Sequence, residues 1–321
     1  MAFRATARPP APVPAHLHMT DFADLVPTAL PASVRLEEGN GGLRRLGIRS
    51  AQGMGEVYLQ GAHVTAWHPA AARNPVLWMS RRSVFEPGRP IRGGVPICFP
   101  WFGPNRANAT APAHGFARLR EWRLVEARED AHGAVTLAMQ LEGADVTPDW
   151  PFRFRVVHRI TFGAVLRMDL EVHNDGTEPF TFEEALHTYF RVRDIGRVSV
   201  TGVEGCEYLD KVGGRRRGRE GDEPLRFAGE TDRIYLGTRA DCVIDDPVER
   251  RRISVGKTGS GSTVVWNPWI GKARAMPDFG DDEWTGMLCV ETCNVDAHAC
   301  TLTPGASHTM SAMITTHDLQ D

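Results

Sequence analysis

Residues 152–162 read FRFRVVHRITF and decide the fold class. Apolar and charged side chains alternate along this stretch, as in an antiparallel strand with one face in the core and the other in solvent. Because successive side chains of a strand point to opposite faces, the pattern assigns two sets of residues. The inward set is Phe152, Phe154, Val156, His158 and Ile160, and the outward set is Arg153, Arg155 and Arg159.

Similar short runs recur on both sides of this stretch. They cover residues 135–141, 166–172, 180–182, 185–192, 198–203 and 287–290, and turn sequences such as HNDGTEP at 173–179 and TPGAS at 303–307 separate them. The dense glycine and proline leave little room for long helices. The spacing predicts an all-β fold, a large antiparallel β-sandwich with few short helices.

The beginning of the chain differs from the rest. Residues 1–20 are rich in proline and alanine and have no hydrophobic period, so we expect a flexible tail there. No break in composition divides the remainder, and residues 21–321 are expected to form a single β-sandwich domain. A chain of 321 residues can bury a large core without disulfides or metals to stabilise it.

Charge and cysteine content limit the partners and the compartment. The 37 basic and 40 acidic residues leave a net charge of −3, which argues against nucleic acid as a partner. No apolar run reaches the ~18 residues of a membrane helix, and the N-terminus lacks the apolar core of a secretory signal. The six cysteines form no CxxC pair and are expected to be reduced thiols. We therefore expect a cytoplasmic monomer that acts on a small molecule.

Two segments combine glycine with cationic side chains. Residues 91–103, IRGGVPICFPWFG, place Arg92 beside two glycines that allow a backbone to approach an anion closely. Residues 113–118, AHGFAR, place His114 four residues before Arg118. A rigid loop with an exposed arginine and a structural histidine would explain these patterns as well, so the residues alone leave both readings open.

Two other segments place titratable groups on strand faces. In EEALHTYF, residues 183–190, His187 shares a face with Ala185 and Tyr189 and could act as a general acid, although a core histidine bonded to a backbone carbonyl is also possible. In MLCVETCN, residues 287–294, Glu291 points to the same side as Cys289 and Cys293. A buried carboxylate needs a partner. Alternate residues of one strand are too nearly collinear for tetrahedral ligation, so this trio predicts no metal site.

Two further segments are less specific. Residues 266–269, WNPW, end a strand with stacking surfaces and an amide, as carbohydrate sites often require, or simply anchor a loop. The arginine-rich stretch GGRRRGREGDEP at 213–224 mixes both charges and predicts a solvated loop or hairpin tip rather than a nucleic-acid surface.

Taken together and in this order, the segments resemble the aldose 1-epimerase superfamily, and more narrowly its hexose-6-phosphate mutarotase branch. The resemblance extends from about residue 35 to the C-terminus. It rests on IRGGVPICFPWFG, HGFAR, LHTYF, TDRIY at 231–235, VVWNPW, FGDDEW and CVET. The family has a galactose mutarotase-like β-supersandwich with an open cleft across one concave sheet, which agrees with the period-two pattern.

The resemblance implies a role for six residues. His187 of LHTYF matches the general acid of the family, and Glu291 of CVET matches its general base. The matching substrate-binding residues are Arg92 and Arg118 for the 6-phosphate, and Asp232 of TDRIY and His114 for the sugar. In one departure, Ala113 stands where the family often has a substrate-binding glutamine, whose place a water, Asn105 or Asn108 could take.

The implied reaction is the interconversion of the α and β anomers of a hexose 6-phosphate, such as glucose 6-phosphate. Glu291, initially ionised, would take the proton of the C1 hydroxyl while a protonated His187 donates to the ring oxygen. The reaction requires no cofactor and no metal. The alternatives are a non-catalytic carbohydrate-binding sandwich, which needs neither an acid nor a base, and an epimerase of unphosphorylated hexoses, which needs neither arginine. A metal-dependent enzyme would need a tight ligand cluster that the sequence does not display.

Overall fold

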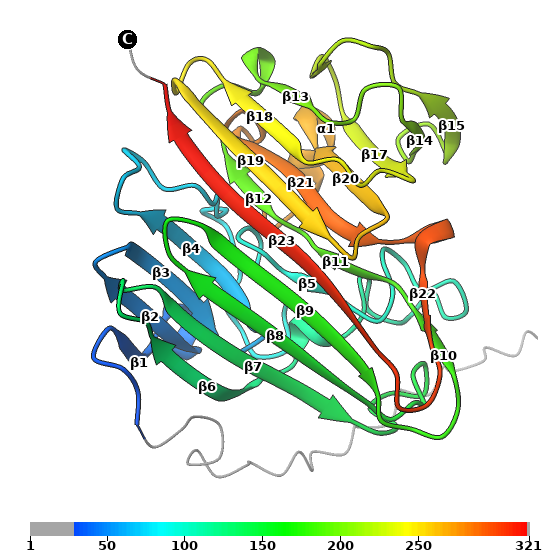
Figure 1. Cartoon of the computed structure of the whole chain (residues 1–321). Coiled ribbons are helices and arrows are strands. Elements are labelled where there is room, and N and C mark those ends of the chain that lie inside the picture. The colour runs from blue at the N-terminus through cyan, green and yellow to red at the C-terminus, as the bar shows by residue number, and fades with distance from the viewer. Residues whose placement is uncertain (1–28, 320–321) are drawn as a thin grey trace, which may run out of the picture.

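The computed structural model describes residues 29–319, and within this range the largest element is a nine-stranded antiparallel sheet. Its longest strands lie side by side in its centre (Figure 1). In spatial order the strands are β16 (Leu225–Arg226), β13 (Ser199–Thr201), β18 (Cys242–Asp246), β19 (Arg251–Thr258), β23 (Ser307–Asp318), β9 (Leu166–Asn174), β8 (Phe154–Phe162), β7 (Val135–Gly143) and β6 (Arg123–Glu129).

A second, eight-stranded antiparallel sheet packs against the first in the described part of the chain. Its spatial order is β15 (Arg216–Arg219), β14 (Glu207–Asp210), β17 (Thr231–Leu236), β20 (Ser262–Asn267), β21 (Met287–Asn294), β11 (Glu184–Leu186) and β5 (Ile97–Cys98), and β12 (Tyr189–Arg191) also pairs with β21. The β14–β15 hairpin forms one edge of this sheet (Figure 1).

The described residues also form two smaller sheets and several short helices. A four-stranded sheet contains β1 (Val34–Glu38), β2 (Arg44–Ser50), β3 (Gly53–Tyr58) and β4 (His63–Pro69), and β10 (Phe180–Phe182) pairs with β22 (Cys300–Leu302). The short helices are α1 (Trp269–Ala275) and the 3-10 turns η2 (Asn40–Gly42), η3 (Ala117–Leu119), η4 (Ile195–Arg197), η5 (Glu283–Gly286) and η6 (Asp296–His298).

The alternation of side chains along β21 explains where the core ends and the site begins. Leu288 and Val290 belong to the main core between the two sheets, together with Ile160 of β8 and Ile314 of β23. The side chains between them, including Cys289, point to the opposite face and join a second apolar cluster. Apolar side chains therefore pack on both faces of the eight-stranded sheet. The face that includes Cys289 also carries the site.

The predicted all-β sandwich with few short helices is confirmed. In β8 the predicted inward residues Phe154, Val156, His158 and Ile160 are buried, whereas the arginines on the other face are half-buried. Residues 213–224 were predicted to be a solvated loop or hairpin tip. Part of this stretch is strand β15, which pairs with β14 at the edge of the sheet. The tail predicted for residues 1–20 lies outside the described residues, and no helix within them is long and apolar enough to cross a bilayer.

Candidate active site

Strand register brings His187 and Glu291 together. Leu186 of β11 lies opposite Thr292 of β21, and Tyr189 of β12 lies opposite Cys289, so the antiparallel count places residue 187 opposite residue 291. The His187 Nε2 and Glu291 Oε1 atoms are 3.3 Å apart. The two residues that the resemblance assigns as acid and base therefore form one pair across two neighbouring strands.

Aromatic rings enclose this pair. The Tyr189 ring stacks on His187 with centroids 4.8 Å apart and planes 13° apart, and the Trp266 ring meets His187 edge-on at 6.0 Å. Only 10% of the His187 side chain and 1% of the Glu291 side chain are exposed. In so dry a site, each nearby charge acts more strongly than it would in water.

Burial sets the protonation of the pair. It lowers the pKa of His187 well below its ordinary value, and repulsion from Arg118 and Arg92 lowers it further. Burial raises the pKa of Glu291 well above its ordinary value, which the ammonium of Lys211 partly opposes. Both directions favour a neutral imidazole and a protonated carboxyl in the free protein. This is opposite to the starting state expected from the sequence, a protonated His187 and an ionised Glu291.

Two polar atoms of the pair have no hydrogen-bond partner. His187 Nδ1 and Glu291 Oε2 are buried and have no hydrogen-bond partner. Buried polar groups without partners are rare in folded proteins and costly. The described residues therefore supply no hydrogen-bond donor to Glu291 Oε2.

Hydrogen bonds hold Arg92 beside the hydroxyl end of Tyr189. Its guanidinium donates to both carboxylate oxygens of Asp278, at 3.0–3.3 Å, and to the Tyr189 hydroxyl at 3.0 Å. These bonds fix its orientation and connect it through Tyr189 to His187. The resemblance assigned Arg92 to phosphate, and the structure gives it a carboxylate partner already.

Arg118 and His114 lie on another side of the pair. The His114 ring is 5.7 Å from that of His187, and Arg118 donates to the Ala113 carbonyl oxygen at 2.7 Å while its Nε is buried without a partner. The backbone N–H of Gly103 donates to His114 Nδ1 at 3.3 Å. Since an accepting Nδ1 carries no hydrogen, the hydrogen of a neutral His114 is on Nε2, which is therefore a donor.

The loop amides near Ala113 are engaged elsewhere. Asn105 Oδ1 accepts from the backbone of its own turn, and Asn108 Nδ2 donates to Asp149 at 2.9 Å. Asn108 therefore does not take the place of the missing glutamine side chain. The side-chain oxygen of Asn105 is likewise already hydrogen-bonded within its own turn.

Asp232 on β17 is paired with two lysines. The Lys211 ammonium is 3.1 Å and the Lys272 ammonium 3.8 Å from its Oδ2 atom. Lys211 also lies over the Phe102 ring, 5.2 Å from the centroid, and Phe102 contacts His114 edge-on at 4.8 Å. Lys211 thus connects the predicted sugar-binding aspartate with the loop that carries His114.

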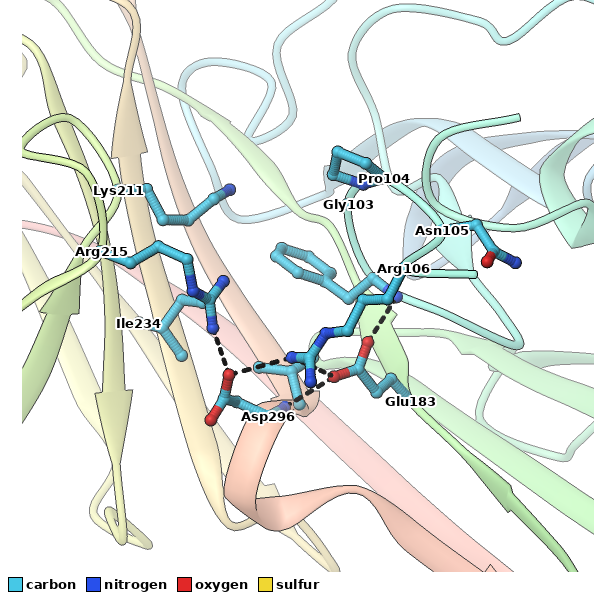
Figure 2. A pocket seen from close by; sticks show the side chains of 11 residues that line it. Gly103, Pro104, Asn105, Arg106, Glu183, Lys211, Arg215, Ile234 and Asp296 are labelled. Carbon is cyan, nitrogen blue, oxygen red and sulfur yellow. Dashed lines mark hydrogen bonds and ion pairs between the residues drawn. The ribbon is translucent and has the colours of Figure 1, made fainter. Parts of the chain in front are cut away.

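A pocket of about 240 Å³ adjoins the site through Lys211 and Phe102. Figure 2 shows Arg106 and Arg215 converging on Asp296, and Arg106 also reaching Glu183. His187 and Glu291 do not line this pocket. The lining residues are Phe102, Gly103, Pro104, Asn105, Arg106, Glu183, Lys211, Arg215, Ile234, Val295 and Asp296.

The sequence analysis assigned no role to Tyr189, Asp278 or Lys211. The shared strand face of LHTYF indicated that Tyr189 stands beside His187. Asp278 precedes the quoted FGDDEW motif, but its partner Arg92 is 186 residues away. Lys211 follows β14 in the hairpin connection, where nothing in the sequence indicates that it reaches Asp232.

Three potential metal donors meet at the pair. Ligand atoms of His187, Cys289 and Glu291 lie within 4.8 Å of one another, a different trio from the single-strand set considered above. Burial raises the pKa of the Cys289 thiol well above its ordinary value. A metal ion binds the thiolate, and burial disfavours this form of Cys289 in the free protein.

The fold and the site define a class. The two-sheet β-sandwich with its buried imidazole–carboxylate pair is that of an enzyme suited to proton transfer. The sequence profile described as "Aldose 1-epimerase" matches residues 46–315. The chain belongs to this family and is an isomerase.

Individual relatives agree with this assignment. Proteins named "Putative glucose-6-phosphate 1-epimerase" from Escherichia coli K12 and Cenchrus ciliaris are 41% and 35% identical, over 73% and 82% of this chain and 77% and 82% of their own lengths. The crystal structure of YeaD from Salmonella typhimurium, described as a "putative mutarotase", superposes with a TM-score of 0.84. Its sequence is 33% identical, and the match covers 90% of this chain and 95% of that one.

Proposed function

We propose that this enzyme interconverts the α and β anomers of a hexose 6-phosphate by opening and closing the sugar ring with His187 and Glu291. The observation that carries the proposal is the pair itself, Nε2 and Oε1 at 3.3 Å in a dry, aromatic-walled site. The relatives from Escherichia coli and Cenchrus ciliaris, both named "Putative glucose-6-phosphate 1-epimerase", favour a phosphorylated substrate.

The geometry suits ring opening because both reacting oxygens of the sugar are bonded to the same carbon. An acid and a base that lie side by side can reach the C1 hydroxyl and the ring oxygen together. Glu291 accepts the hydroxyl proton and His187 donates to the ring oxygen; rotation about the C1–C2 bond of the open aldehyde exposes its other face before closure. Each of the two groups contributes roughly 10²–10⁴-fold in rate.

In this proposal the phosphate of the substrate also changes the protonation of His187 and Glu291. Arg118 and Arg92 repel a proton from His187 in the free enzyme. A phosphate dianion bound near these guanidinium groups cancels part of that repulsion, and the proton moves toward the imidazole while Glu291 becomes ionised. Phosphorylated substrate thereby produces the protonation state that the reaction needs.

An epimerase of unphosphorylated hexoses is the second candidate. The observation in its favour is that Asp278 already holds Arg92 from both carboxylate oxygens. A guanidinium with a bidentate carboxylate partner has less capacity left for phosphate. In that reading Arg92 serves to orient Tyr189.

Exchange NMR with glucose 6-phosphate and with free glucose tests both candidates. The wild type should accelerate anomer exchange of the phosphorylated sugar, and Glu291→Gln should lose this acceleration. The matched control is Glu171→Gln, because Glu171 forms a surface pair with His173 at 2.9 Å on β9. No acceleration of either sugar would refute the catalytic proposal.

The same assay with Arg118→Met tests the phosphate. We expect KM for glucose 6-phosphate to rise by more than tenfold, the effect of losing a charge-assisted bond of about 1.5–3 kcal/mol, with a much smaller change for glucose. Arg128→Met, an exposed arginine paired with Glu126, is the control. Equal acceleration of both sugars by the wild type would favour the unphosphorylated substrate.

A further inference from the structure

A second cluster of ligating side chains lies outside the active site. It consists of Glu184 at the start of β11, Cys300 at the start of β22 and His308 on β23. One ligand atom from each lies within 4.8 Å of the other two. The cluster therefore joins three strands that belong to three different sheets.

The carboxylate of this cluster is incompletely satisfied. Glu184 has an exposed fraction of 0%. Its Oε1 accepts from Asn294 Nδ2 at 2.8 Å and lies 3.3 Å from His308 Nε2. Its Oε2 is buried and has no partner. A buried carboxylate oxygen without a donor is costly. A bound ion that contacts the Glu184 carboxylate would reduce this cost.

The donor set identifies the class of that atom. One imidazole nitrogen, one thiol sulfur and one carboxylate oxygen are the ligands of Zn²⁺ and of related borderline divalent cations, whereas Mg²⁺ and Ca²⁺ prefer oxygen alone. Cys300 is half-buried and 27% of the His308 side chain is exposed. Solvent access gives the ion a path of entry and leaves room for water as a fourth ligand.

We propose that Glu184, Cys300 and His308 form a binding site for a thiophilic divalent cation of the zinc class. His308 Nε2 lies 2.9 Å from the Gly259 carbonyl oxygen and 3.3 Å from Glu184 Oε1, so binding of the ion releases the proton that His308 holds there, and the ion replaces it as the counter-charge to Glu184. It is structural rather than catalytic: it links β22 and β23 to β11, three residues before His187. This site is separate from the proposed reaction, and either proposal can fail without the other.

Cobalt(II) and zinc(II) are the probes for this site. The full chain, freed of any affinity tag and stripped with a chelator, should bind one Co²⁺ with a thiolate-to-metal charge-transfer band, and Zn²⁺ should displace it. Cys300→Ser should abolish the band. Cys206→Ser is the matched control, because Cys206 is another half-buried thiol and belongs to none of the donor clusters among the described residues.

Two more variants separate the alternatives. Glu184→Gln keeps the side chain's shape and should weaken Zn²⁺ by more than the ~10–100-fold that loss of a supporting hydrogen bond costs. Cys289→Ser removes the thiol of the active-site trio and should leave the band intact. The proposal is wrong if the wild type gives no band, if the band survives in Cys300→Ser, or if Cys289→Ser is the variant that removes it.

Discussion

The chain places an imidazole, a thiol and a carboxylate together at each end of β11. At the first residue of the strand, Glu184 meets Cys300 and His308, and just after its last residue, His187 meets Cys289 and Glu291. We refer to these as the outer and the inner cluster. The inner cluster is enclosed by aromatic rings and influenced by Arg92, Arg118 and Lys211, whereas the outer cluster reaches solvent and the charge facing Glu184 is that of His308.

The difference shows that identical donor types acquire different chemistry from their surroundings. Burial keeps the inner thiol protonated and shifts the inner pair toward its neutral form. Solvent access leaves the outer donors open to a metal ion. The predictions below test this contrast, from the largest expected effect to the smallest.

The largest effect should come from the inner imidazole. His187→Asn removes the acid but keeps a hydrogen-bonding side chain, so we expect anomer exchange of glucose 6-phosphate to fall by about 10²–10⁴-fold, with KM nearly unchanged. Exchange NMR measures both quantities. His173→Asn on β9 is the control, and a similar loss in both variants would show that the effect is not specific to the pair.

Buried neutral imidazoles should make the folded state sensitive to acid. Burial lowers the pKa of both His63 and His158 to about 4. These groups bind protons more weakly in the folded than in the unfolded state, so the free energy of unfolding should decrease as the pH falls from 6.5 toward 4. Each shift corresponds to at most about 3.4 kcal/mol. Urea unfolding at several pH values measures this dependence, and a flat profile in that window would contradict it.

Zinc should stabilise the wild type through the outer cluster. An ion that binds the folded chain and not the unfolded one adds about 2.7 kcal/mol when its free concentration is a hundred times Kd. We therefore expect thermal unfolding to move up by several degrees with Zn²⁺ in the wild type and in Cys206→Ser. If Cys300→Ser shows the same increase, the ion binds elsewhere.

The smallest effect should come from Lys211, which touches the inner cluster only through its charge. Lys211→Met removes the ammonium that lowers the pKa of Glu291, so the carboxylate should ionise at higher pH. We expect a loss of kcat/KM of a few-fold near neutral pH that recovers in alkaline buffer. Lys272→Met is the comparison, because Lys272 also faces Asp232 but is not one of the charges that change the pKa of Glu291. A loss that is independent of pH would indicate a purely structural role for Lys211.

Much of this architecture could be read from local patterns. The alternation in residues 154–162 depends on side chains two positions apart, which any strand places on one face, and β8 has the predicted burial. The prediction of a continuous run at 185–192 was less accurate, because the chain forms two short strands, β11 and β12. The bend between them depends on contacts of His187 and Tyr189 with the backbone of residues 94–96, which no local pattern contains.

The amino-acid sequence by itself determined the fold class and the family. Alternation and turn spacing are short-range properties, and the motifs that carry the resemblance are contiguous. The tertiary structure alone decided what the candidate residues face. Register places His187 opposite Glu291, the hairpin brings Lys211 to Asp232, and three sheets assemble the outer cluster around Glu184. The physical reason is that pairing partners and burial arise from contacts between segments as far as 186 residues apart, and these contacts influence the charge state of the groups in the site.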